Sequence, residues 1–203
     1  MLDYFDLVKQ KLVFDKPDTI YMIDITYRRV DHRDNWVYPR TQYPVKWFCI
    51  KKTEDLDTVK PEVIALCEAM GARAYINTSP RYYLDNIRQA CDNLKSDNFI
   101  HNKKELYIDK IGLYLGTCPS YDVKYTIDVD TKDIEYKQRV IDHIDSVEGN
   151  HDWYWFEIET NKGYHIYAKP FNTTGFKAAF PLTDIVENRG ILLYFPQSLT
   201  KNE

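Results

Sequence analysis

The N-terminal half of the chain contains several runs with the composition and two-residue period of β-strands. Residues 19–28 and 45–50 are rich in β-branched and aromatic side chains, and residues 72–77 form a third, shorter run. The polar and charged residues 30–43 separate the first two runs. This pattern predicts two strands joined by a hairpin loop, followed later by a third strand.

Helical spacing alternates with these strands. In residues 59–70 the apolar positions lie on one stripe, Pro61 is expected in the first turn, and Gly71 provides the C-terminal stop. The same spacing predicts helices over residues 2–14 and 81–94.

The C-terminal half combines both periods. Residues 125–130 form an apolar, β-rich run, residues 133–147 have helical spacing, and two strands flank the turn at residues 160–163. A hairpin requires antiparallel pairing, which argues against a doubly wound parallel sheet. We therefore expect an α+β fold with mixed or antiparallel sheets flanked by helices.

The length of 203 residues allows one sizeable core or two small ones. The polar segment 95–105 is the best candidate for an internal boundary. We expect a single domain over residues 1–203, made of an N-terminal α/β module at about 1–104 and a second module at about 105–203.

Composition indicates a soluble globular protein, with 44% hydrophobic and 29% charged residues. No run approaches the roughly 20 apolar residues of a membrane span, and the first residues do not resemble a signal peptide. We therefore expect a cytoplasmic protein without a membrane partner. The cysteines form no C-x-x-C pair, which favours free thiols; they are Cys49, Cys67, Cys91 and Cys118.

The formal net charge of −4 argues mildly against nucleic-acid binding, because proteins that bind nucleic acid with a whole domain are often strongly basic. A working groove needs only a local basic patch, however. An ordinary solvated surface explains each candidate patch equally well. The candidates are Arg28, Arg29 and Arg33, and Lys46, Lys51 and Lys52.

Two carboxylates stand out within the apolar run at residues 125–130. Asp128 and Asp130 are two residues apart and would share one face of a strand, whereas Ile127 and Val129 would take the other. Carboxylate oxygens are the ligands that Mg²⁺ and Mn²⁺ prefer, so the pair is a candidate metal site. A solvated strand edge is the ordinary alternative, since Asp-x-Asp is a common sequence.

A second polar group follows in the predicted hairpin. His165 would share a strand face with Tyr167, and Lys162 and Gly163 lie in the turn. A cation and exposed backbone amides in a turn can bind phosphate. A hydrogen-bonded structural histidine and a turn chosen for its conformation remain open alternatives.

The order of these motifs resembles the three-motif signature of the archaeo-eukaryotic primase superfamily. The motifs are Asp128-Val129-Asp130, the segment 161–165 ending in His165, Asp184-Ile185, and a terminal segment over residues 192–199. The helix, strand and helix expected over residues 66–81 resemble the module that precedes the catalytic half in small phage and mobile-element members.

The resemblance implies an RRM-like catalytic core and a DNA-directed nucleotidyltransferase, acting as a primase, a primer-extending polymerase or both in DNA replication. Asp128, Asp130 and Asp184 would be the catalytic acids and would hold two Mg²⁺ or Mn²⁺ ions. The partners would be a single-stranded DNA template and NTP or dNTP, with a separate helicase or priming subunit as a further partner.

The resemblance also implies how the substrates are held. Lys162, Gly163 and His165 would bind the nucleotide triphosphate. Family members often carry a basic residue just before the terminal segment; here that nucleotide contact would come from Arg189 or be absent. Two further residues are candidates for nucleic-acid contact, although a salt bridge explains either one; they are Arg73 and Arg81.

Three alternatives remain open on the sequence alone. The chain could be a catalytically inactive nucleic-acid-binding module with the same fold, or a metal-dependent nuclease that uses the same acids. The third acid could also differ, because Asp184 competes with Glu187 and could be a helix or turn cap.

Overall fold

The computed structural model divides into two compact units. Unit 1 comprises residues 1–121 and 192–203, and unit 2 comprises residues 122–191. The structure describes residues 2–32, 36–82, 84, 88, 123–147, 154–187 and 189–200. The expected boundary at residues 95–105 lies outside these described residues.

Unit 1 contains a sheet in the spatial order β1-β10-β4-β2-β3, and β5 also pairs with β2. β2 pairs antiparallel with β3, β4 and β5. The strands are β1 (Leu2–Asp3), β2 (Thr19–Arg28), β3 (Gln42–Ile50), β4 (Arg73–Ile76), β5 (Arg81–Tyr82) and β10 (Ile191–Phe195). The predicted strands over residues 19–28, 45–50 and 72–77 are therefore confirmed.

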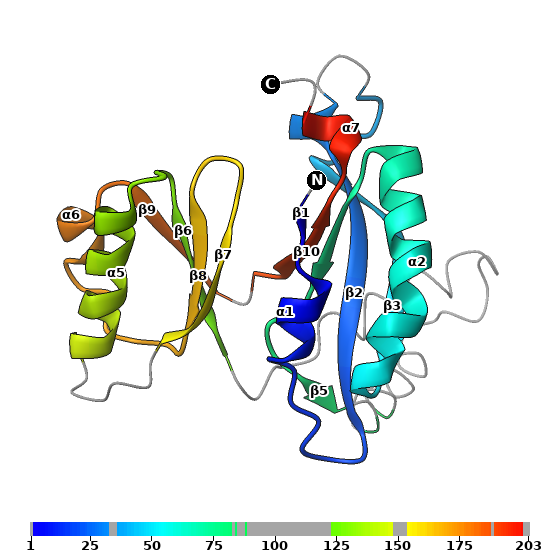
Figure 1. The fold of residues 1–203 in the computed structure, drawn as a ribbon, viewed down its shortest axis with the longest axis horizontal. Coiled ribbons are helices and arrows are strands. Elements are labelled where there is room, and N and C mark those ends of the chain that lie inside the picture. Colours follow the sequence, from blue (N-terminus) through cyan, green and yellow to red (C-terminus); the bar gives the residue numbers. More distant parts are fainter. Residues whose placement is uncertain are drawn as a thin grey trace, which may run out of the picture. The chain divides into compact units, whose positions relative to one another are not determined.

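The long helix of unit 1 is α2 (Thr53–Met70), which runs along β2 and β3 (Figure 1). It begins six residues before the predicted start, so Pro61 lies inside the helix and not in its first turn. Asp55 supports the early start, because its Oδ2 accepts hydrogen bonds from the backbone N–H groups of Lys51 (2.8 Å) and Lys52 (3.2 Å). Gly71 ends the helix with a left-handed φ of 59°, as predicted.

The shorter helices of unit 1 are α1 (Phe5–Lys9), the 3-10 turn η1 (Arg29–Asp31) and α7 (Gln197–Thr200). The helix predicted over residues 2–14 is shorter than expected, since β1 occupies Leu2–Asp3. Arg81 lies in β5 and not in the predicted helix over 81–94, most of which falls outside the described residues.

Unit 2 has the element order strand, helix, strand, strand, helix, strand. Its sheet has the order β7-β8-β6-β9, and every neighbouring pair is antiparallel. The elements are β6 (Tyr125–Val129), α5 (Ile134–Val147), β7 (Tyr154–Glu159), β8 (Tyr164–Ala168), α6 (Phe176–Ala179) and β9 (Thr183–Glu187). Both units are thus α+β with antiparallel pairing, which confirms the predicted class.

The core of unit 2 lies between the helices and one face of this sheet. Ile127 and Val129 of β6 and Ile166 of β8 are buried there against Val140 and Ile144 of α5. Since side chains alternate along a strand, the residues between these apolar positions lie on the opposite face. The amphipathic pattern of β6 therefore sends Asp128 away from the helical side.

The C-terminal segment differs from the expected second module. β10 lies between β1 and β4 in the sheet of unit 1, so residues 192–203 belong to that unit. All five β10 residues are buried, as in a strand covered on both faces. No helix in the described part of the chain is long and apolar enough to cross a membrane.

Candidate active site

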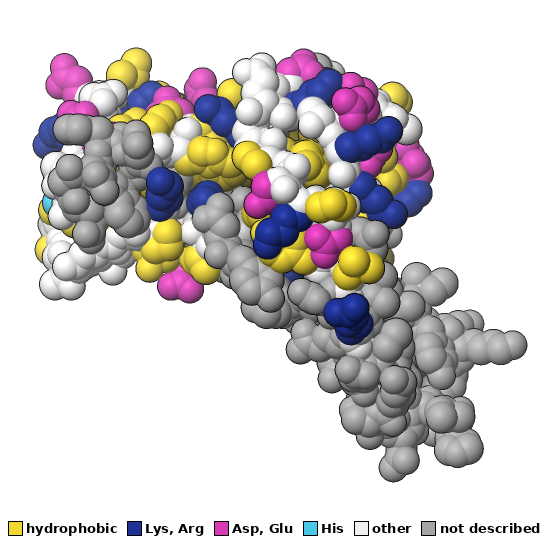
Figure 2. Space-filling model, turned by 90° about the horizontal axis from the view of Figure 1, so that it is seen from below, with side chains coloured by type: hydrophobic (Ala, Val, Ile, Leu, Met, Phe, Trp, Pro, Cys, Tyr) yellow, Lys and Arg dark blue, Asp and Glu magenta, His cyan; other side chains and the backbone are white. Residues whose placement is uncertain are grey.

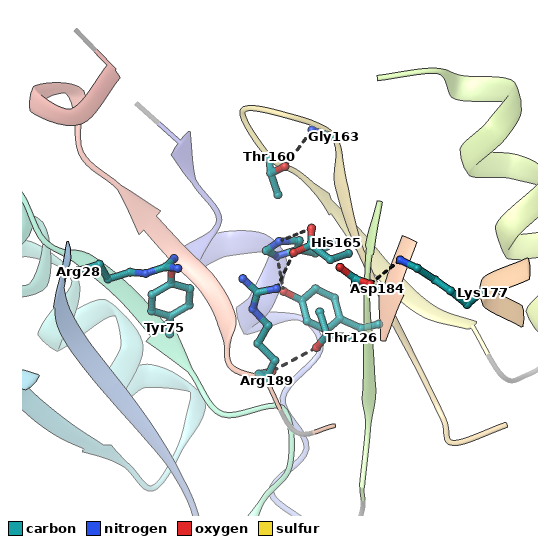
Figure 3. Close-up of polar contacts among 11 residues, drawn as sticks. Arg28, Tyr75, Thr126, Thr160, Gly163, His165, Lys177, Asp184 and Arg189 are labelled. Atoms are coloured by element: carbon teal, nitrogen blue, oxygen red, sulfur yellow. Dashed lines mark hydrogen bonds and ion pairs between the residues drawn. The ribbon is translucent and has the colours of Figure 1, made fainter. Parts of the chain in front are cut away.

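Three predicted site residues form a row across neighbouring strands of unit 2. In the strand register Asp128 of β6 lies opposite His165 of β8 on one side and opposite Asp184 of β9 on the other. Residues directly opposite each other share a sheet face, with Cβ atoms about 4.5–5.5 Å apart. The fold therefore brings these three side chains together on the face opposite α5. Figure 3 shows two of them, His165 and Asp184.

Asp128 is the residue on which the polar contacts of the row converge. Its Oδ1 lies 3.3 Å from His165 Nε2, and its Oδ2 accepts a hydrogen bond of 2.6 Å from the Arg189 guanidinium. Burial alone would raise the pKa of Asp128, but the hydrogen bonds and charges of His165 and Arg189 outweigh it and lower the pKa to about 2. Asp128 is therefore ionised at neutral pH.

His165 is held in a largely buried position, with 7% of its surface exposed. The Tyr167 hydroxyl lies 3.5 Å from its Nδ1, and the Tyr167 ring stacks on Phe156 at 4.7 Å. The two ring nitrogens therefore face the Tyr167 hydroxyl and the Asp128 carboxylate, and an Nε2–H group at this position donates to the carboxylate. This orients the imidazole toward the carboxylate row.

Arg189 is positioned by both its backbone and its side chain. Its carbonyl accepts a hydrogen bond of 3.3 Å from the Thr126 hydroxyl on β6, while its guanidinium reaches Asp128 (Figure 3). Thr126 and Asp128 are two residues apart on one strand face. The same face thus fixes the arginine and the carboxylate that it pairs with.

Asp184 lies in strand β9 and not at a helix cap. Its Oδ1 pairs with Lys177 Nζ at 2.5 Å, and its side chain is 68% exposed. Glu187, the competing acid, lies opposite Tyr125. The strand alternation therefore places Glu187 on the other face from Asp128, which favours Asp184 as the third acid.

Asp130 follows the end of β6 and is exposed, and its backbone N–H donates to the Leu182 carbonyl at 2.9 Å. Because β6 ends at Val129, the strand alternation that predicted a shared face with Asp128 stops one residue short of Asp130.

The turn between β7 and β8 packs against this end of β6. A Cβ on Gly163 would lie 1.8 Å from the Val129 carbonyl oxygen, so only glycine fits there. The Gly163 N–H donates to the Thr160 hydroxyl at 3.1 Å (Figure 3). Lys162 is exposed in the same turn.

The two arginines predicted to contact nucleic acid lie in unit 1. Arg73 forms an ion pair with Asp31, and its guanidinium lies 4.4 Å from the Phe195 ring centroid. Arg81 lies in β5 opposite Ile20. The contacts of Arg73 are those of the salt bridge that the sequence offered as its alternative role.

Sequence reasoning missed two residues of the site. Thr126 carried a usable signal, because it precedes Asp128 by two positions in a strand and must share its face. Lys177 carried none, since its contact with Asp184 depends on the path of the chain between α6 and β9.

The donor chemistry of the row fits a divalent metal, although the carboxylates are not arranged as a finished site. Among the described residues, no group of three or more His, Cys, Asp or Glu side chains is placed to hold a metal ion. Asp128 and Asp184 are instead each neutralised by a cationic side chain. Carboxylate oxygens are nonetheless the ligands that Mg²⁺ and Mn²⁺ prefer.

No family model, curated protein or solved structure matches the chain.

Proposed function

We propose that this protein is a nucleotidyltransferase of the archaeo-eukaryotic primase type, which acts as a primase, a primer-extending polymerase or both. The observation that carries the proposal is the row formed by Asp128, His165 and Asp184. These residues come from three motifs far apart in the sequence, and a shared active site requires such motifs to converge.

The topology of unit 2 supports the same reading. Its element order and its strand order β7-β8-β6-β9 are those of the split βαβ arrangement, to which RRM-like domains belong. In this arrangement the three strands that carry the motifs, β8, β6 and β9, are neighbours. An RRM-like catalytic core is what the resemblance implied.

The proposed chemistry uses Mg²⁺ or Mn²⁺ held by Asp128, Asp184 and Asp130. Such ions would supply Lewis-acid activation of the attacking hydroxyl and would offset the charge that develops on the leaving pyrophosphate. Arg189 now occupies one oxygen of Asp128, and Lys177 one oxygen of Asp184. Both cationic side chains lie beside the carboxylates that would hold the metal, and there they would contact the oxygens of an NTP or dNTP triphosphate.

His165 and the β7–β8 turn would complete the nucleotide site. His165 Nε2 faces the carboxylate row and can donate a hydrogen bond to a phosphate oxygen there. Lys162 is exposed beside Gly163 and provides a further cation. A single-stranded DNA template would direct the transfer, and a helicase or priming subunit would act alongside.

One observation favours a second candidate, a non-catalytic nucleic-acid-binding module. Asp128 and Asp184 are each already paired with a cation, and an inert domain could retain such pairs simply for stability. A metal-dependent nuclease would use the same acids.

The nature of the product separates these candidates. The protein is incubated with primed or unprimed single-stranded DNA, labelled NTPs or dNTPs, and Mg²⁺ or Mn²⁺. Extended primers or de novo oligonucleotides support the proposal. Shortened DNA without incorporation would assign the site to a nuclease, and unchanged DNA with no incorporation would assign it to the inert module.

A further inference from the structure

A cluster of aromatic rings covers the end of the β2–β3 hairpin in unit 1. Tyr27 stacks on His32 with 3.8 Å between ring centroids and on Trp36 with 5.4 Å. Tyr38 stacks on Tyr43 at 4.4 Å and meets Trp36 edge-on at 5.3 Å. The rings support one another, so their orientations are largely fixed before any ligand arrives.

Two of these rings face solvent. Tyr38 is 37% exposed and Tyr43 is 47% exposed. Aromatic side chains in a protein core bury far more of their surface than this. β3 is also the edge strand of its sheet, so this end of the hairpin is accessible to a partner along an edge.

Arginines lie at the same end of the hairpin. Residues 28–32 and 36–43 contain Arg28, Arg29 and Arg40, and their acid, Asp31, is ion-paired with Arg73. The charge left available in these two ranges is therefore positive. This contrasts with the net charge of −4 for the whole chain and with the face in Figure 2, where basic and acidic side chains are intermixed.

A pocket of about 510 Å³ opens beside these arginines. It is lined by Arg28, Arg29, Val30, Thr41 and Gln42. One guanidinium nitrogen of Arg28 donates to the Tyr75 hydroxyl at 2.8 Å, while its Nε is buried without a hydrogen-bond partner. The pocket thus offers guanidinium, hydroxyl and amide groups to an anionic ligand.

We propose that this hairpin-end surface, formed by Arg28, Arg29, Tyr38, Arg40 and Tyr43, binds single-stranded nucleic acid. Bases stack on the exposed tyrosines, and phosphates contact the arginines, whose planar guanidinium groups suit phosphate geometry. The charge decides which partner fits, because a polyanion complements a surface whose available charges, among the described residues of the hairpin end, are those of arginines. Under the proposed function, this surface would bind the template strand. Only the role as a template site rests on the proposed function; the binding of nucleic acid does not.

The binding itself can be measured without any catalysis. Fluorescence anisotropy is recorded with labelled oligo(dT) and oligo(U) at low salt, in EDTA and without nucleotide. Tyr38→Ala with Tyr43→Ala should weaken binding about tenfold or more, whereas Tyr38→Phe with Tyr43→Phe, which keeps the rings, should bind like the parent. Arg29→Ala with Arg40→Ala should weaken binding and reduce its dependence on salt concentration.

Two control variants make the result specific. Arg139 is an exposed arginine on α5, and its guanidinium carbon lies 5.4 Å from the centroid of the Tyr136 ring. The Arg139→Ala variant should bind the oligonucleotides like the parent. Glu187→Gln, which removes an exposed carboxylate outside the row, should also bind like the parent. The measurement needs neither metal nor nucleotide, so a failure of the proposed chemistry would not affect it. Melting curves confirm that each variant is folded.

Several outcomes would overturn the assignment. These are no oligonucleotide binding by the parent, parent-like binding by the tyrosine-to-alanine variant, or an equal loss with Arg139→Ala. If the parent instead self-associates in sedimentation, and the tyrosine-to-alanine variant alone does not, the surface is a protein contact.

Discussion

At the scale of single residues, Asp128 links the electrostatics of the candidate site to stability. Its pKa is lowered to about 2, below the ordinary value of 3.8, because His165 and Arg189 favour the charged carboxylate over the opposing effect of burial. The resulting stabilisation is fully present above about pH 4 and is lost as pH falls toward 2. With allowance for screening of a partly exposed group, it amounts to about 1–2 kcal/mol.

Asp128→Asn should therefore lose less unfolding free energy between pH 5 and pH 2 than the parent does. The amide cannot titrate, so the contribution of this carboxylate disappears from the pH profile. Urea unfolding at several pH values measures the difference. Parallel profiles for the two proteins would mean that the pairs made by Asp128 contribute nothing to stability.

His165 has a structural and a proposed catalytic role, which two substitutions can separate. His165→Ala removes the donor to Asp128 and should cost about 1.5–3 kcal/mol, in addition to weakening nucleotide binding. His165→Gln keeps a donor and should recover part of the stability and part of the nucleotide binding. Calorimetric titration with a nucleotide, beside melting curves, measures both; parent-like nucleotide binding by the folded alanine variant would show that the histidine is structural.

At the scale of elements, the site depends on how closely the β7–β8 turn approaches β6. Gly163→Ala would place a Cβ 1.8 Å from the Val129 carbonyl and 2.9 Å from the Thr131 backbone, and neither backbone can yield as a flexible side chain would. We expect a loss of about 3 kcal/mol or more in unfolding free energy.

Gly175→Ala is the matched control for that substitution. Gly175 has a φ of 75° but nothing within 4 Å of the added Cβ, so only backbone strain of about 1 kcal/mol applies. Denaturant midpoints compare the two variants. Equal losses would indicate that the turn moves away from β6 at little cost.

The elements also show what the sequence could and could not predict. Apolar periodicity located β2, β6 and α5, because each buries apolar side chains. β3 was located by its β-forming residues alone, since Ile50 is its one buried position. Periodicity missed the start of α2, since Leu56 is the sole buried residue in the first six positions of that helix. Polar turns extend helices without leaving a periodic signal.

At the scale of the whole molecule, the sequence did not predict which strands far apart in the chain pair with one another. The apolar run of β10 reads as a strand, but nothing in the run indicates that it joins β1 and β4 in unit 1. The same limit applies to the candidate site. The motif order identified Asp128, His165 and Asp184, whereas the contacts of Arg189 and Lys177 depend on chain paths that periodicity does not encode.

Nucleotide incorporation by variants of the row tests the proposed function most directly. Labelled dNTP incorporation on a primed template with Mn²⁺ is compared among the parent, Asp128→Asn, Asp184→Asn and Glu187→Gln. The last variant removes an exposed carboxylate from the other face of β9 and leaves the row intact. We expect Asp128→Asn and Asp184→Asn to abolish incorporation and Glu187→Gln to retain it. Full activity in either aspartate variant would contradict a metal-dependent transfer centred on these carboxylates.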